Sequence, residues 1–156
     1  TNKERERMEF HIYGADENYV EDCLSEKQIP EIVAHGRVAR EDVTRALAMS
    51  DFSILLRPAN ERYTKAGFPT KSVEAMMNGC AMICNLTSDL GMYLKDEKNS
   101  IIVENCSSEA MTQALRKVIK LNRQEINEVK ENAHKTAKEY FDYRIWVSAV
   151  KEFIEG

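Results

Sequence analysis

Five short apolar runs, separated by stretches of helical character, constrain the fold of this chain more than any other feature. The runs are rich in β-branched and aromatic residues and occupy Met8–Gly14, Ile32–Val38, Phe52–Arg57, Ala81–Leu86 and Ser100–Glu104. The intervening stretches that we expect to be helical are Tyr19–Lys27, Arg40–Ser50, Thr70–Asn78 and Asp89–Lys95. Strands that alternate with helices form a parallel sheet with right-handed crossovers and helices on both faces. The sequence therefore predicts an α/β fold of this kind.

The chain after Ser107 is helical in character to its end and adds C-terminal helices to this fold. Two apolar stripes at helical spacing predict two helices there, and a last helix over Tyr143–Phe153 carries Trp146. The stripes consist of Met111, Leu115, Val118 and Ile119, and of Ile126, Val129, Ala133 and Ala137. We expect residues 1–156 to form a single lobe.

Composition excludes several classes of protein. The chain has 156 residues, of which 43% are hydrophobic and 31% charged, a globular composition. A net charge of −4 and a pI of about 5.5 argue against sequence-independent nucleic-acid binding. No apolar run approaches the roughly 20 residues that a spanning helix needs.

The cysteines predict a reducing compartment. Their spacing contains no Cys-x-x-Cys pair and no histidine nearby to complete a zinc site, so we expect reduced, buried thiols and a cytoplasmic protein. The charged start of the chain, Thr1–Arg7, lacks the apolar core of a signal peptide. Because the chain does not begin with Met, we also expect it to be a piece of a longer protein.

The longest irregular connection follows the third apolar run and extends from Pro58 to Pro69. Ligands of parallel sheets bind at the carboxyl ends of the strands, and long loops in compact domains are usually functional. Pro69 and Thr70 mark a helix start, where unpaired N–H groups and the helix dipole favour an anion. We expect the amides of Thr70, Lys71 and Ser72 to form this anion site. Gly79 is expected to end the helix in a left-handed conformation.

Lys71 and Glu74 share one face of this helix. A cation beside the helix start and a carboxylate one turn further suit a nucleoside diphosphate, because the carboxylate can accept hydrogen bonds from a ribose diol. An exposed Lys–Glu pair on a surface helix explains the same spacing equally well. The spacing alone leaves both interpretations open.

Three stretches, taken in order, resemble the C-terminal, nucleotide-sugar-binding lobe of GT-B glycosyltransferases of group 1, the retaining family 4. They are His35–Val38, Ala48–Pro58 and Gly67–Asn85, and the Pro-Thr-Lys-x-x-Glu-Ala-Met-x-x-Gly block in the third is the most specific. Asn99–Val103 is similar to the last strand of that lobe. The resemblance implies a Rossmann-like lobe that binds a nucleotide-diphospho-sugar.

The resemblance also implies roles for individual residues. Glu74 matches the carboxylate that holds the ribose hydroxyls, and Thr70 and Lys71 match the place where the helix start meets the diphosphate. Gly36 and Arg37 fall in the loop that borders the base, where contacts are often made by the backbone. Arg57 ends the preceding strand and is expected to reach a phosphate or the sugar.

The sequence departs from the family pattern in three respects. Many relatives have a second glutamate eight residues before the one at Glu74, where this chain has Ala66. The first βα unit of the lobe, a source of basic phosphate contacts, and the N-terminal acceptor lobe are expected to be absent. We therefore predict little or no transfer by this chain alone.

The function implied by the resemblance is sugar transfer from a nucleotide-diphospho-sugar, for polysaccharide or glycoconjugate assembly. The expected partners are the donor and, through the missing lobe, a glycan or lipid-linked acceptor, with peripheral membrane association of the parent protein at the inner face. No Asp-x-Asp sequence is present for a divalent metal, so we expect metal-independent hexosyl transfer without a cofactor. No catalytic nucleophile is visible. The alternative is a non-catalytic nucleotide-binding module or an α/β interaction module.

The histidines give weaker signals. We expect His11 and His35 to be structural, with a ligand contact as the lesser alternative for His35, and His134 to be solvated on its helix. Asp89 is expected to act as an acid near a helix start, with a ligand-facing position as the alternative.

Overall fold

The computed structural model describes residues 8–24 and 29–156, which fall into two compact units. The first unit extends to Ala46 and the second from Leu47 to Gly156, so that the division lies within helix α3 (Arg40–Met49). The predicted features at residues 1–7 and at 25–27, the end of the expected helix Tyr19–Lys27, lie outside the described residues. We describe the two units separately.

The first unit contains a pair of parallel strands. Strand β1 (Phe10–Ile12) pairs with β2 (Ile32–Ala34), so that His11 lies opposite Val33. Helix α2 (Glu17–Cys23) follows β1 and begins at Asp16, whose carboxylate accepts a hydrogen bond from the Tyr19 amide at 2.9 Å. This cap satisfies one of the unpaired donors of the first turn and fixes the helix start.

The second unit is built on a parallel sheet of three strands in the order β3-β4-β5. The strands are β3 (Phe52–Leu55), β4 (Ala81–Cys84) and β5 (Ser100–Ile102). Every residue of the central strand β4 is buried, because helices cover both of its faces. This burial is why its sequence is continuously apolar rather than alternating.

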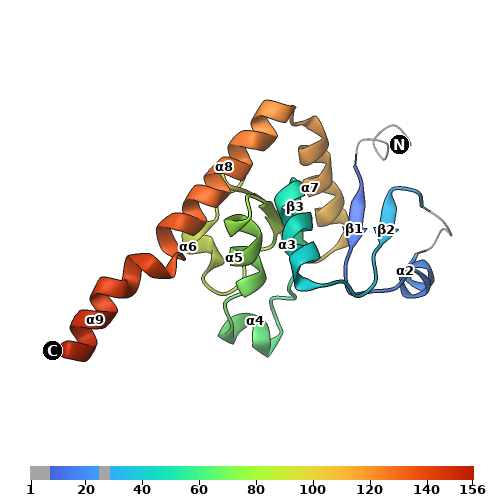
Figure 1. The fold of residues 1–156 in the computed structure, drawn as a ribbon. Helices are drawn as coiled ribbons and strands as arrows, with labels where there is room; N and C mark the ends of the chain where they lie inside the picture. Colours follow the sequence, from blue (N-terminus) through green and yellow to red (C-terminus); the bar gives the residue numbers. More distant parts are fainter. Residues whose placement is uncertain (1–7, 25–28) are drawn as a thin grey trace. The chain divides into compact units, whose positions relative to one another are not determined.

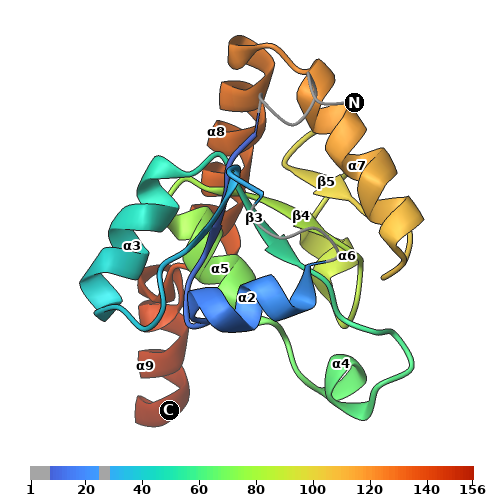
Figure 2. The same cartoon turned by 90° about the vertical axis from the view of Figure 1, so that its right-hand side faces the viewer.

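Helices pack on the two faces of this sheet (Figures 1 and 2). Helices α5 (Thr70–Met77) and α8 (Arg123–Tyr140) lie side by side on one face, where Met76, Met82 and Ala133 are fully buried. Helix α7 (Ser108–Lys120) covers the other face, over Ile83, Ile101 and Val103. The short helices α4 (Arg62–Ala66) and α6 (Leu90–Tyr93) follow β3 and β4.

The chain ends in a 3₁₀ turn, Tyr143–Trp146, and helix α9 (Val147–Glu155), which extends away from the rest of the second unit (Figure 1). Large apolar side chains of this segment are exposed, among them Trp146 of the 3₁₀ turn and Val150 and Phe153 of α9. These residues recur at helical spacing and form one stripe.

All five predicted strands and the predicted C-terminal helices are confirmed, with shorter strands than the apolar runs. The structure divides the strands into two sheets rather than one. Gly79 ends α5 with a φ of +75°, as predicted. The connection Pro58–Pro69 is not wholly irregular, because it contains α4.

The cysteines are all free thiols, and Cys80 and Cys84 are buried as predicted. The prediction of burial is wrong for Cys23 and Cys106, which are exposed. Cys23 lies in the last turn of α2 and Cys106 in the loop before α7.

Candidate functional site

The carboxyl ends of β3 and β4 are joined by one side chain. The Asn85 amide accepts a hydrogen bond from the Arg57 N–H at 2.8 Å and donates one to the Arg57 carbonyl at 2.7 Å. Asn85 is buried, with 5% of its surface exposed. It completes the backbone pairing of β3 one step beyond the ladder and so fixes the point where the loop after β3 begins.

Arg57 holds that loop together. Its guanidinium donates hydrogen bonds to the carbonyls of Gly67 at 2.9 Å and Tyr63 at 2.8 Å, and lies 5.7 Å from the centre of the Tyr63 ring. A third, longer contact reaches the Thr87 hydroxyl at 3.5 Å. These bonds give Arg57 a structural role in the loop, and its contact with a phosphate or the sugar stays a prediction.

Thr64 closes the same loop from inside. It is almost completely buried, and its hydroxyl lies within hydrogen-bonding distance of the carbonyls of Pro58, at 2.9 Å, and Glu61, at 2.6 Å. The hydroxyl thus stabilises the turn that leads into α4. Asn85, Thr87 and Thr64 were not among the predicted site residues. For Asn85 and Thr87, the only signal in the sequence was the polar segment Asn85–Asp89 that follows a buried strand.

Helix α5 begins directly after the loop. Pro69 is its N-cap residue and is buried, and within the described ranges no acceptor is present for the amides of Thr70 and Lys71. Both residues are exposed. Unpaired amides at the positive end of a helix are the groups that bind phosphate oxygens at helix starts.

The prediction for Ser72 is wrong. Its amide donates to the Pro69 carbonyl at 3.0 Å and its hydroxyl donates to the same carbonyl at 2.6 Å. The side chain is fully buried, because position 72 of the helix faces inward. Ser72 therefore supports the first turn of α5 and offers no donor to a ligand.

Lys71 and Glu74 are both exposed on α5. Among residues 8–24 and 29–156, neither side chain has a hydrogen-bond or ion-pair partner, so the two do not pair with each other. An exposed cation and carboxylate one turn apart, both free to bind, agree better with a ligand-binding face than with a surface ion pair.

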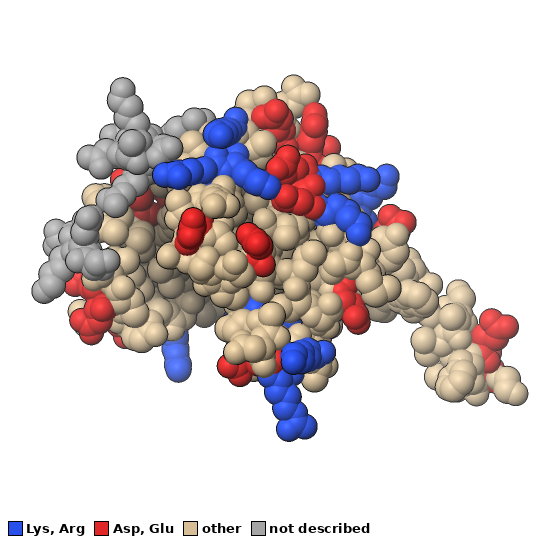
Figure 3. Space-filling view, turned by 180° about the vertical axis from the view of Figure 1, so that it is seen from behind, with Lys and Arg blue, Asp and Glu red and all other residues tan. Residues whose placement is uncertain are grey.

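The sequence around α4 and α5 is locally basic. Residues 57–74 contain four basic and two acidic side chains in a chain whose net charge is −4. Elsewhere, on the face drawn in Figure 3, basic and acidic side chains are interspersed. The local excess of cations favours an anionic ligand at this end of the sheet.

Ala66 ends α4 at the position where the family pattern expects a carboxylate, and its side chain is exposed. Glu61, the nearest preceding acid, is the N-cap residue of α4 and caps it without a side-chain hydrogen bond. The structure thus leaves Glu61 as an exposed carboxylate at the far end of the same short helix.

Gly36 and Arg37, in the first unit, follow β2. Gly36 adopts a φ of +63°, and both of its backbone groups are paired: its N–H donates to Ala15 at 3.0 Å and its carbonyl accepts from Gly14 at 2.7 Å. Arg37 is exposed. Since the Gly36 amide is occupied, the expected backbone contact to a base is limited to the second lone pair of its carbonyl.

The predictions for the remaining residues, His35, His134 and Asp89, have different outcomes. His35 makes a hydrogen bond to His11, as expected for a structural histidine. His134 is half-buried rather than fully solvated, and its ring nitrogen lies 3.1 Å from the Met76 carbonyl near the end of α5. Asp89 is the N-cap residue of α6 and is exposed, without a side-chain cap.

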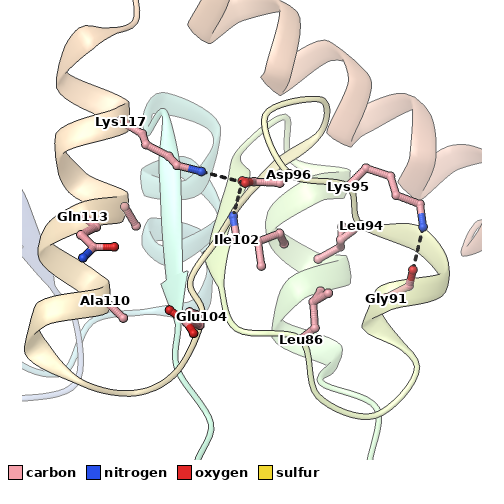
Figure 4. Close-up of a pocket in the computed structure, with 11 residues that line it drawn as sticks. Leu86, Gly91, Leu94, Lys95, Asp96, Ile102, Glu104, Ala110, Gln113 and Lys117 are labelled. Carbon is pink, nitrogen blue, oxygen red and sulfur yellow. Dashed lines mark hydrogen bonds and ion pairs between the residues drawn. The ribbon is translucent and has the colours of Figure 1, made fainter.

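A separate cavity of about 510 Å³ lies between β5, α6 and α7 (Figure 4). Its apolar lining includes Leu86, Leu94 and Ile102, and its cations are already paired. Lys117 binds Asp96 at 2.8 Å, and hydrogen bonds to Asp96 and Glu97 raise the pKa of this lysine. The cavity, as the described residues form it, therefore has no free cation for a phosphate.

Comparison with known proteins identifies the class of this lobe. The family described as glycosyl transferases group 1 matches residues 1–138, and the chain belongs to this family. The family does not favour the alternative of a non-catalytic interaction module. No curated protein matches the chain.

Solved structures agree with this fold. Anabaena HepE in complex with UDP and glucose matches with a TM-score of 0.64 and 18% identity over 81% of this chain and 32% of its own. A mutant of S. aureus TarM, solved with UDP among other ligands, matches with a TM-score of 0.73 and 15% identity. This match covers 98% of the present chain and 29% of TarM. The pneumococcal O-GlcNAc transferase GtfA, in complex with UDP and GlcNAc, matches with a TM-score of 0.70 and 16% identity. This match covers 99% of the present chain and 31% of GtfA. The chain thus spans about a third of each of these proteins and has the fold of the Rossmann-like C-terminal lobes of GT-B enzymes.

Two further searches cover the described part of the chain only. None of its helices combines the length and the apolar character required to cross a membrane. Within the same residues, no three histidine, cysteine, aspartate or glutamate side chains are grouped to hold a metal ion.

Proposed function

We propose that this chain is the donor-binding lobe of a glycosyltransferase that transfers a sugar from a nucleotide-diphospho-sugar to a glycan or lipid-linked acceptor. The observation that carries the proposal is the exposed face of α5, where Lys71, Glu74 and the amides of Thr70 and Lys71 are free to bind. Membership of the group 1 family gives this face its chemical context.

The proposed arrangement follows from the charges. The carboxylate of Glu74 accepts hydrogen bonds from the ribose hydroxyls, while Lys71 and the two amides take the diphosphate. During transfer the bond between the anomeric carbon and the phosphate oxygen breaks, and negative charge collects on the diphosphate. Fixed donors at that place stabilise the developing charge, each by about 3 kcal/mol.

We further propose that this charge stabilisation is metal-independent and that the anomeric configuration is retained, as the resemblance implies. The acceptor-binding groups lie in a part of the protein outside this sequence, so we expect little or no transfer by the chain alone. The free thiols support a reducing, cytoplasmic location. As the resemblance implies, we also propose peripheral membrane association of the parent protein and a polysaccharide or glycoconjugate as the product.

The proposal is tested by titrating the chain with UDP, GDP and ADP in a calorimeter. Lys71→Ala and Glu74→Ala are each expected to lower the affinity for the nucleoside diphosphate that binds by about tenfold or more, because each removes a charge-assisted hydrogen bond. The matched controls are Lys135→Ala and Glu131→Ala, which remove the same charges from exposed positions on α8. If the α5 variants bind as tightly as the α8 variants, the donor site is not on this face.

A further inference from the structure

Helix α4 carries two cations that the proposed contacts to the ribose and the diphosphate leave unused. Arg62 and Lys65 are exposed and lie three positions apart, so they share one face of this short helix. Among residues 8–24 and 29–156, neither side chain has a hydrogen-bond or ion-pair partner. Two long cationic side chains on one face can bind the same anion.

The rest of this face leaves the two cations uncompensated. Ala66 lies four positions after Arg62 on the same side of the helix and is exposed, while Thr64 is almost completely buried. Glu61 stands four positions before Lys65, a spacing that allows an ion pair, but within the described chain the two side chains do not pair. The surface that Arg62, Lys65 and Ala66 form, which we call the α4 face, is therefore positively charged.

The α4 face lies near the proposed diphosphate site. Helix α4 lies beyond the carboxyl end of β3 (Figures 1 and 2), and three residues join its end to the first residue of α5. The Cα atoms of Ala66 and Thr70 are therefore at most about 14 Å apart. Hydrogen bonds from Arg57 to the carbonyls of Tyr63 and Gly67 hold α4 in this place.

The positions of Lys71 and Glu74 set the direction of a bound donor. Its ribose is expected at Glu74, one turn into α5, and its diphosphate at the start of this helix, with Thr70 and Lys71. In a nucleotide-diphospho-sugar, the sugar is attached on the side of the diphosphate opposite the ribose. The sugar is therefore directed away from Glu74, past the start of α5, toward the preceding segment that contains α4.

We propose that the α4 face binds a carboxylate on the sugar, so that the donor is a nucleotide-diphospho-hexuronic acid. This inference rests on the proposed donor-binding function and names its substrate class. The Arg62 guanidinium presents paired N–H donors that fit a carboxylate, and Lys65 adds a second charge. Ala66 supplies no carboxylate that would repel the charged sugar or accept hydrogen bonds from the hydroxyls of a neutral one. A neutral hexose would leave both cations without a charged partner.

The test compares two donors that differ only at C6 of the sugar. UDP-glucose and UDP-glucuronate are titrated into the chain at neutral pH and constant ionic strength. The GDP or ADP esters of the same two sugars take their place if GDP or ADP binds more tightly than UDP. The wild-type chain is expected to bind the glucuronate ester about tenfold more tightly than the glucose ester, because only the former makes charge-assisted hydrogen bonds to the α4 face.

Three variants assign the preference to the α4 face. Arg62→Ala and Lys65→Ala are each expected to lower the affinity for the glucuronate ester by about fivefold and to leave that for the glucose ester unchanged. Ala66→Glu places a negative charge on this face and is expected to lower the affinity for the glucuronate ester relative to that for the glucose ester. The matched controls are Arg116→Ala and Lys120→Ala, which remove the same charges from exposed positions on α7 and are expected to affect neither ester.

The outcomes separate this inference from the proposed function. Equal affinity for the two esters, or tighter binding of the glucose ester, overturns it; weaker binding of both esters by Lys71→Ala then leaves the donor site standing. Equal loss of both esters in Arg62→Ala and Lys65→Ala also overturns it, because the cations then serve the diphosphate. A preference for glucuronate that both variants keep overturns the assignment to the α4 face. Absence of binding by UDP, GDP and ADP overturns the inference together with the proposed function.

Discussion

The two hydrogen bonds of Asn85 predict an unusually large effect for a small substitution. Asn85→Ala removes both bonds and leaves the N–H and the carbonyl of Arg57 without partners at the end of β3. Each buried polar group left unpaired costs about 1–3 kcal/mol. Because Arg57 is only half-buried and water can reach part of it, we expect a loss of about 2–4 kcal/mol in the free energy of unfolding.

Urea unfolding followed by circular dichroism measures this loss. With a denaturant dependence of about 2 kcal/mol per molar urea, the middle of the usual range, the midpoint is expected to fall by about 1–2 M. The matched control is Asn105→Ala, in which the same substitution removes one hydrogen bond, to the Ser107 amide at 2.8 Å, at an exposed turn. We expect the control to cost less than about 1 kcal/mol, since solvent replaces the lost partner.

Two results would refute the reasoning. If Asn85→Ala costs no more than Asn105→Ala, the buried amide does not hold the strand ends. If Asn85→Asp, which keeps the acceptor for the Arg57 N–H but loses the donor to its carbonyl, is as stable as the wild-type chain, the second bond contributes nothing.

Two other predictions concern thiols and acid. Burial raises the pKa of Cys80 and that of Cys84 to about 12. A thiol-reactive disulfide is therefore expected to modify only the two exposed cysteines of the native chain rapidly. Equal rates for all four thiols would contradict the described packing. Burial raises the pKa of Asp51, but hydrogen bonds from Arg123 and Lys130 outweigh it and lower the pKa below its usual value. A lowered carboxyl pKa adds stability above the unfolded-state pKa of about 3.9 that is lost as the pH falls through the folded-state pKa. The melting temperature of Asp51→Asn is therefore expected to fall less between neutral pH and pH 3 than that of the wild-type chain.

The parts of the fold that the sequence predicted well have strong local causes. The apolar run around Ala81–Cys84 predicts a strand covered on both faces, and Pro69 and Gly79 mark the start and end of α5. Helix α4 was missed because five residues, without a side-chain cap, give no helical period. Lys71 and Glu74 could be selected from their spacing and from the resemblance, since both depend on local sequence.

The other site features depend on contacts between distant segments. Asn85 binds Arg57 across 28 positions, and His11 binds His35 across 24, so neither pair has a signature in a local window. Ser72 illustrates a different difficulty, because its amide is taken up by the first turn of its own helix. The direction of a side chain around a short helix start is decided by packing, which spacing alone does not give.

The loop between β3 and α5 is held almost entirely through its main chain. Arg57 binds the carbonyls of Tyr63 and Gly67, and Thr64 contacts those of Pro58 and Glu61. Carbonyl groups are the same whichever side chain they follow, so positions 59, 60, 62, 65 and 66 can change identity while the shape of the loop is kept. Natural divergence or directed evolution can therefore alter the chemistry presented beside α5, including a carboxylate restored at Ala66, without rebuilding the fold beneath it.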